Sequence, residues 1–516
     1  MKFFGFIIHN QINKINTHHM AATGSVCTSE GAEETAVIAE DSCSIWGSVR
    51  LTYSICAFFA MMLHLCMRNA MSFAILCMVK SNFTHTAPSF AAQDEFKKCG
   101  EFDMNATNRI SEYSEFDWTR SEEFLLLGCF YYGYLVALPI GGRLCDKFGG
   151  KMCFIHSLTL QAVLFMLSPV FARQSYVTLV IMRAIQGLVA GFGNPAIYQL
   201  YSVWAHPSER TALLSFGYGG YSLGSLLVLP LSSFLCHFGW SMVFYCIGGV
   251  SLAYGICCHW LIYSTLDSHP RLTDEERKYL KTGNIHTKMP TIPWKSIFTS
   301  ISVNAFLVTH ICHTFGIIVL TLLLPKFLNE TMRFGLNETG IYSSVPFVGS
   351  CLSKVLMVAL CKSIQAKLVQ NFTRFRRRVY AGCNCLTILF LIGVILLDCS
   401  HKYFLVVLIL FIGMTTDVAF SGAYWVSLLD CAPSFVGLLS GISNSLATLV
   451  GSLAPMGISK IIVLGSKSEW DMIFLLMISA YSLSAIVYGL WGSSELQPWA
   501  KQLKPEPNDH ANNNNI

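Results

Sequence analysis

The feature that most constrains this chain is a succession of apolar runs, each long enough to cross a bilayer. A helix needs about 20 mainly apolar residues to span about 30 Å of hydrocarbon, and about twelve runs meet this requirement. They lie near residues 52–79, 123–143, 153–172, 177–202, 212–235, 241–263, 303–325, 341–361, 380–398, 403–429, 437–463 and 472–492. Charged residues make up only 13% of the 516 residues, against about 25% in soluble domains. The sequence therefore predicts an all-α integral membrane protein embedded in the lipid bilayer.

The runs form two groups of six, separated by the longest internal polar stretch. That stretch contains RLTDEERKYLK, a short amphipathic helical pattern. The layout is typical of a transporter built from two parallel halves. The expected organisation is a polar cytoplasmic tail (1–49), a six-helix half (50–265), a cytoplasmic connector (266–302), a second six-helix half (303–493) and a cytoplasmic tail (494–516).

Lysine and arginine are concentrated in alternate loops, and such loops face the cytoplasm. This bias places both termini in the cytoplasm. The longest outer loop, about residues 81–122, contains glycosylation sequons at Asn82 and Asn105, so we expect both to be glycosylated. A sequon at Asn371 lies beside RFRRR on the cytoplasmic side, where it should stay unmodified.

Several functional classes have no support in the sequence. The net charge of +5 is too small to indicate binding of nucleic acid. Most of the 20 cysteines lie inside apolar runs, where they behave as small hydrophobes, so neither a disulfide framework nor a metal site is expected. A phosphate-binding P-loop, a Ser/His/Asp arrangement and an HExxH motif are absent. We therefore predict neither an enzyme nor an ATP-driven pump, and no cofactor.

The segment after the second run reads GGRLCDKFGGK, residues 141–151, and is expected to be a loop. Its pattern of glycines, aspartate and lysine resembles the signature of the major facilitator superfamily. The resemblance implies two six-helix halves around a central cavity that opens alternately to each side. It also implies that Asp146 and Lys147 are gating residues and not catalysts.

Three further segments carry a more specific resemblance. They are residues 183–216 with the W-x-x-P-x-E-R pattern at 204–210, residues 428–451, and SSELQPWA at 493–500. These, with the second run, resemble the anion and phosphate symporter family that includes sialin and the vesicular glutamate transporters. The resemblance implies a secondary transporter of a small anionic solute: an organic anion of the sialic acid or acidic amino acid type, or inorganic phosphate. Its membrane would be lysosomal, vesicular or the plasma membrane.

Charged side chains inside spans are costly in lipid and therefore indicate function. Arg68 lies deep in the first run and Arg183 in the fourth. A guanidinium can bind a carboxylate through two parallel hydrogen bonds, so we expect both arginines to bind the anion. His313, in the seventh run, stands where the resemblance places an arginine in vesicular glutamate transporters, and it is the third candidate for substrate binding.

The coupling mechanism is left open. The resemblance implies a glutamate seven residues after Arg183, but this chain has Ala190 there. Asp417 and Lys354 lie inside other spans, and their opposite charges suggest that they neutralise each other. Either Asp417 senses protons, or transport is driven mainly by membrane potential and the solute gradient. Coupling to H⁺, to Na⁺ or to membrane potential therefore all stay open.

Two other functions on the same fold also stay open. One is a transport-dead receptor or nutrient sensor, which loss of binding residues would favour. The other is an anion-conducting channel mode, which electrical recording would expose.

Overall fold

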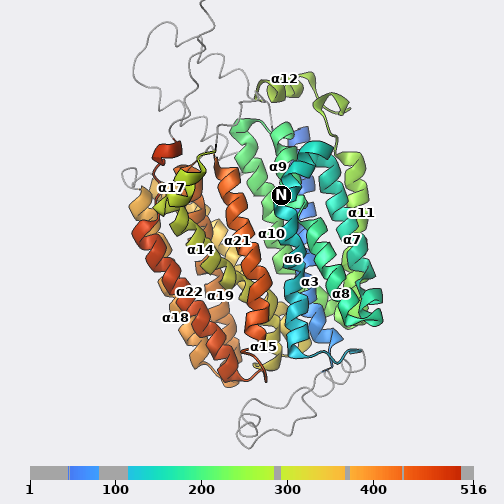
Figure 1. Ribbon diagram of the computed structural model, residues 1–516, viewed down its shortest axis with the longest axis vertical. Helices are drawn as coiled ribbons and strands as arrows, with labels where there is room; N and C mark the ends of the chain where they lie inside the picture. The colour runs from blue at the N-terminus through green and yellow to red at the C-terminus, as the bar shows by residue number, and fades with distance from the viewer. Residues whose placement is uncertain are drawn as a thin grey trace, which may run out of the picture. The chain divides into compact units, whose positions relative to one another are not determined.

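A computed structural model describes residues 45, 47–80, 114–283, 292–365, 372–432 and 435–500 (Figure 1). The sequons at Asn82, Asn105 and Asn371 lie outside these ranges, as do most residues of the two tails. The side chain of Asp146 is also outside the described set, although its backbone belongs to a helix.

Twelve membrane-length helical segments follow the predicted runs within the described residues. They are α3 (Val49–Met78), α6 (Arg120–Phe148), α7 (Gly150–Gln174), α8 (Tyr176–Ala190) with α9 (Gly193–Trp204), α10 (Pro207–Cys236), α11 (Trp240–Leu261), α14 (Ile301–Ile318) with α15 (Leu324–Glu330), α17 (Val345–Gln365), α18 (Phe372–Leu396), α19 (Lys402–Ala419) with α20 (Trp425–Cys431), α21 (Val436–Ser459) and α22 (Lys467–Trp491). Ten of these segments are long and apolar enough to cross a membrane. The other two, α6 and α17, occupy the two remaining runs. The all-helical membrane fold is therefore confirmed.

The chain divides into two compact units. The first contains the helices from α3 to α12 (Asp274–Gly283), together with Thr321–Ser344 and Ser452–Ser466. Inside this unit α3 packs on α10 and α11, α6 packs on α8, and α7 packs on α8 and α11. The second unit contains Thr287–Leu320, Val345–Gly451 and the chain from Lys467 onward. Its main packed pairs are α17 with α19, α18 with α19 and α22, and α14 with α22.

Large apolar side chains are exposed along the membrane-length helices of both units. Phe234 on α10, Val250 on α11 and Leu389 on α18 each have about 60% of their surface exposed. In water such surfaces would aggregate, whereas lipid solvates them. Their distribution agrees with helices that contact a bilayer.

The segment from 141 to 151 is not a loop, which corrects the expectation from its sequence. Helix α6 continues through Phe148, and α7 begins at Gly150, so Gly149 alone joins them. Gly149 has φ +86°, a conformation that residues with a Cβ rarely adopt. The reversal therefore needs only one residue, and the preceding motif residues stay helical.

Two glycines set the crossing of α6 and α8. A Cβ atom at Gly187 would lie 1.8 Å from the carbonyl oxygen of Phe130, and one at Gly133 would lie 1.7 Å from that of Ala184. Any side chain at either position would force the two backbones apart. The two helices therefore approach each other more closely than larger residues would permit.

The amphipathic pattern in the connector is a helix, as predicted. On this helix, α12, Glu276 pairs with Arg50 at the start of α3, with 3.1 Å between Nε and Oε1. Arg50 is fully buried and also pairs with Glu209, of the W-x-x-P-x-E-R segment, at 2.5 Å. These contacts attach the connector helix to the start of α3.

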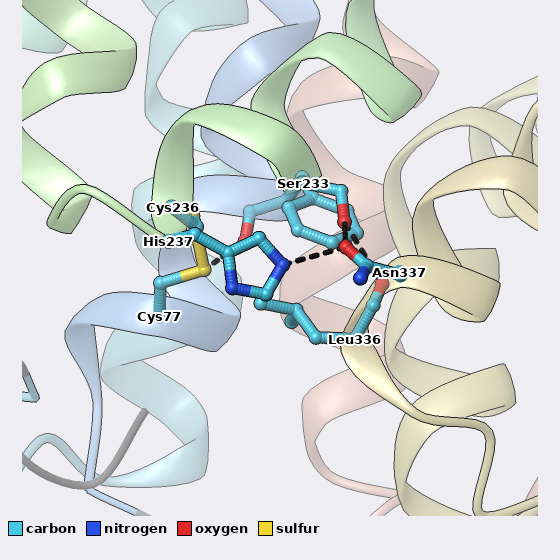
Figure 2. The surroundings of a disulfide bond; sticks show 7 residues. Cys77, Ser233, Cys236, His237, Leu336 and Asn337 are labelled. Atoms are coloured by element: carbon cyan, nitrogen blue, oxygen red, sulfur yellow. Dashed lines mark hydrogen bonds between the residues drawn. A yellow bond between two sulfur atoms is a disulfide. The ribbon is translucent and has the colours of Figure 1, made fainter. Parts of the chain in front are cut away.

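Three of the described cysteines, Cys77, Cys236 and Cys399, are disulfide-bonded, although no disulfide framework is expected from the sequence. Cys77, near the end of α3, and Cys236, the last residue of α10, form a disulfide. Figure 2 shows this bond beside His237, whose Nε2 lies 2.6 Å from Oδ1 of Asn337. The pairing could not be predicted because the two residues are 159 positions apart and meet only when α3 packs on α10.

Candidate functional site

A polar pocket lies inside the first unit, among helices α3, α6, α8, α9 and α10. Its lining residues are Met61, His64, Leu65, Arg68, Phe130, Tyr134, Ala190, Gly193 and Tyr221. The pocket thus includes one of the three predicted substrate-binding residues, Arg68. It also includes Ala190, the position where the family resemblance implies a glutamate.

Arg68 is partly buried and forms no ion pair within the described part of the chain. Its Nε donates to Oδ1 of Asn69 at 3.3 Å. Its guanidinium carbon lies 6.0 Å from the ring centroids of both Tyr131 and Tyr221. Aromatic rings stabilise a cation only modestly, so most of the positive charge of Arg68 remains uncompensated.

Asn194, on α9, connects tyrosines of two other helices beside this pocket. Its Nδ2 donates to the hydroxyl oxygen of Tyr134 at 2.6 Å. Its Oδ1 accepts from the hydroxyl of Tyr221 at 3.1 Å and from that of Tyr218 at 3.5 Å. The network fixes three phenol groups around the pocket, and these can give or take hydrogen bonds with a polar solute.

His64 precedes Arg68 by four residues and lies on the same face of α3. Its side chain is buried, with Nδ1 2.5 Å from Oε1 of Gln161 on α7. Its Nε2 is buried without a hydrogen-bond partner among the described residues. His64 is not among the site residues predicted from the sequence. The signal was a second polar residue one helical turn from Arg68 inside an apolar run.

Arg183 is buried close to Arg68 but does not line the pocket. Its Nη2 donates to the backbone carbonyl of Arg68 at 3.2 Å, and its Nη1 donates to Oε1 of Gln186 at 3.0 Å. Gln186 is in turn held by Ser168 on α7, at 2.8 Å. This geometry makes Arg183 a positioning residue for Arg68, while its predicted direct contact with the anion stays a prediction.

His313 lies in the second unit, whereas the pocket belongs to the first. It is buried, with its ring stacked on Phe420 at 5.4 Å between centroids and edge-on to Tyr424 at 5.6 Å. Tyr424 also lies 2.9 Å from Nδ1 of His310. Phe420 and Tyr424 belong to a π-helical turn between α19 and α20 (Phe420–Tyr424), and such turns are frequent at functional sites.

Lys354 and Asp417 are brought together in the second unit. Their Nζ and Oδ1 atoms are 3.5 Å apart, which confirms the expected pairing. Lys147, near the end of α6, has an exposed side chain, with its Nζ 5.5 Å from the ring centroid of Phe148. The gating role predicted for Lys147 and Asp146 stays a prediction.

The comparisons with known proteins agree with this architecture. The family model of the Major Facilitator Superfamily matches residues 57–455. The chain is 30% identical to an uncharacterised transporter of Caenorhabditis elegans, over 90% of this chain and 95% of the relative. It is also 30% identical to human sialin, over 88% of this chain and 91% of sialin. Vesicular glutamate transporters and a putative inorganic phosphate cotransporter from Drosophila ananassae are further relatives.

A solved structure supports the fold alone. It is that of a bacterial homologue of the human lysosomal transporter Spinster, with a TM-score of 0.62 and 11% identity, over 88% of this chain and 99% of that one.

The family model and the similar proteins together show that the chain is a multi-pass membrane transporter and not an enzyme. It belongs to the Major Facilitator Superfamily, and within it to the anion and phosphate transporter family of sialin and the vesicular glutamate transporters.

Proposed function

We propose that this transporter carries a small organic anion of the sialic acid or acidic amino acid type, or inorganic phosphate, by alternating access, and that Arg68 binds the anion. The observation that carries the proposal is the uncompensated charge of Arg68. An arginine inside a span costs free energy unless an opposite charge accompanies it. None of the residues lining its pocket is acidic. A bound anion supplies the missing negative charge, and a carboxylate or phosphate matches the guanidinium fork.

Arg183 supports the same site indirectly. Because its guanidinium binds the backbone of Arg68 and the side chain of Gln186 at once, it fixes the turn of α3 that presents Arg68. A lysine has no planar fork and cannot make both contacts in that geometry. The site therefore needs an arginine at position 183 even if the solute never touches it.

The test is uptake into proteoliposomes that contain the purified protein, with radiolabelled sialic acid, L-glutamate and inorganic phosphate as separate probes. We expect uptake of at least one probe, lost in Arg68→Ala and reduced about tenfold or more in Arg68→Lys and Arg183→Lys. Arg173→Ala is the matched control, because Arg173 is exposed and pairs with Glu115 outside the pocket.

Normal uptake of every probe by Arg68→Ala would overturn the site. Binding of a probe without any uptake would instead indicate a receptor. Single-channel currents carried by the probe would indicate a conducting mode.

A further inference from the structure

We infer that His64 binds the proton that accompanies the anion, so that the two ions occupy the Arg68 pocket together. This inference rests on the proposed anion site and goes beyond it by naming the coupling residue. It depends on three features of His64: the state of its two nitrogens, its access to the pocket, and the charges that surround it.

The hydrogen bond to Gln161 defines which nitrogen is free. The amide oxygen of Gln161 can only accept, so Nδ1 of His64 carries the hydrogen and donates it across 2.5 Å. In the neutral imidazole Nε2 then holds a lone pair. This nitrogen is buried without a partner in the described structure, in a residue that is 6% exposed. It is a vacant proton acceptor.

Gly193 leaves room beside this nitrogen. A Cβ atom at position 193 would lie 3.3 Å from Nε2, so any side chain there would crowd it. Gly193, His64 and Arg68 all line the same pocket. A solute that binds Arg68 therefore comes within reach of Nε2.

Because of the groups around His64, protonation of Nε2 is more favourable when an anion is bound in the pocket. They are Arg68 on α3, Tyr134 on α6, Gln161 and Ser157 on α7, Ala190 at the end of α8, Gly193 at the start of α9, and Tyr221 on α10. The one full charge among them is that of Arg68, and it opposes a second positive charge one turn away. Ala190 has no group that could bind a proton. A bound anion neutralises Arg68 and offers an acceptor for the new Nε2 hydrogen.

The proton and the anion therefore favour each other's binding. The step moves one proton from solution to Nε2 of His64 and forms no covalent bond. Because coupling between two ligands is reciprocal, the apparent affinity for the anion should rise as the pH falls. The limit is about tenfold per pH unit while His64 is neutral in the empty pocket.

The experiment measures uptake of labelled sialic acid, L-glutamate and phosphate at external pH 5.5, 6.5 and 7.5, with the membrane potential clamped. We expect wild-type uptake to increase as the pH falls, whereas the residual uptake by His64→Gln no longer changes with pH. The ratio of variant to wild-type uptake removes any titration of the probe itself. His156→Gln is the control, because His156 is exposed on α7, and it should follow the wild-type curve.

Gln161→Glu provides a second, independent variant. A carboxylate against Nδ1 stabilises the charged imidazole, so the pH response should move to higher pH. If His64→Gln does not reach the membrane, the shift of the pH response in Gln161→Glu tests the role of His64 by itself. Unchanged pH curves in both variants would overturn the role of His64 while leaving the anion site intact. Failure of the wild type to carry any of the three probes would overturn the proposed function, and this inference with it.

Discussion

The Nζ atom of Lys354 lies 3.5 Å from Oδ1 of Asp417, and the hydroxyl of Ser353 donates to Oδ2 of the same carboxylate at 2.6 Å. Asp417 is 11% exposed at its side chain, whereas Lys354 is 44% exposed. Both contacts stabilise the negative charge of Asp417. Lys354 lies near the middle of α17, so the pair is inside a span although the Lys354 side chain is partly exposed.

This pairing leads to a prediction about coupling. We expect Asp417→Asn to retain stimulation of uptake by a pH gradient at clamped potential, because the proton acceptor is placed at His64. The energy of the pair itself is measurable from the unfolding of Lys354→Ala, Asp417→Asn and the double variant. Loss of the pH response in Asp417→Asn, with anion exchange intact, would assign proton sensing to Asp417 instead.

The succession of apolar runs was sufficient to predict the helices, because twenty apolar residues in lipid have no alternative to helix. The end of α6 could not be predicted because charged residues at 143–147 are typical of a loop, whereas only Gly149 has the conformation that ends the helix. Arg68 could be found because a charge is conspicuous inside a run. A role for His64 could not be predicted from the sequence, because it depends on the hydrogen bond to Gln161. Gln161 lies 97 positions away and contacts His64 only when α3 and α7 pack.

The disulfide between Cys77 and Cys236 gives a prediction about stability and orientation. It closes a loop of 159 residues, so Cys77→Ser should destabilise the protein by about 2–4 kcal/mol. Thermal melting in detergent measures this loss. Reductant should shift the wild type more than Cys77→Ser, in which Cys399 is still disulfide-bonded. Cys385→Ser is the control, because Cys385 is an exposed free cysteine.

The same bond bears on which side of the membrane the helix ends face. Disulfides persist in oxidising compartments. The predicted orientation puts the ends of α3 and α10 on the non-cytoplasmic side, in agreement with a disulfide there. Labelling of Cys77 in intact cells by an impermeant maleimide only after reduction would support this orientation. Labelling without reduction would contradict the bond.

His269 gives a prediction about pH and the connector. It lies among Tyr53, Trp204 and Tyr263, outside the spans, and burial lowers its pKa from the ordinary value. Its Nδ1 accepts a hydrogen bond from the backbone N–H of Arg271 at 3.1 Å, which requires that nitrogen to be unprotonated.

A histidine with a depressed pKa in the folded state stabilises the fold fully above its unfolded pKa of about 6.5, and this contribution is lost as the pH falls below that value. We therefore expect trypsin to cleave the connector after Lys278 and Lys281 faster at pH 5.5 than at pH 7.5, after correction for the pH dependence of trypsin on a denatured control. His269→Asn, which keeps an acceptor near the Arg271 N–H, should reduce this pH dependence. His259→Gln, at an exposed position on α11, should not change it.

A cluster of four charges joins the start of α6 to α15 inside the first unit. Lys326 is 2% exposed and pairs with Glu123 and with Glu330, the latter at 3.6 Å, and Arg120 pairs with Glu330 as well. The positive and negative charges balance. Removing one member leaves a buried charge without its partner, and this is far more costly than removing a matched pair.

We therefore expect Lys326→Met to destabilise the protein by about 3–5 kcal/mol, because Glu123 and Glu330 would then share only Arg120. Lys326→Met combined with Glu123→Gln should cost much less than the sum of the two single changes, because it removes a matched pair of charges. Thermal melting of the two single variants and the double variant gives this coupling energy. Helix α6 comes from the first half of the sequence and α15 from the second. The single change Lys326→Met should therefore also weaken the contact between α6 and α15. Equal stability of Lys326→Met and wild type would mean that lipid headgroups or water already solvate these charges, and the cluster would then have no role in holding α6 to α15.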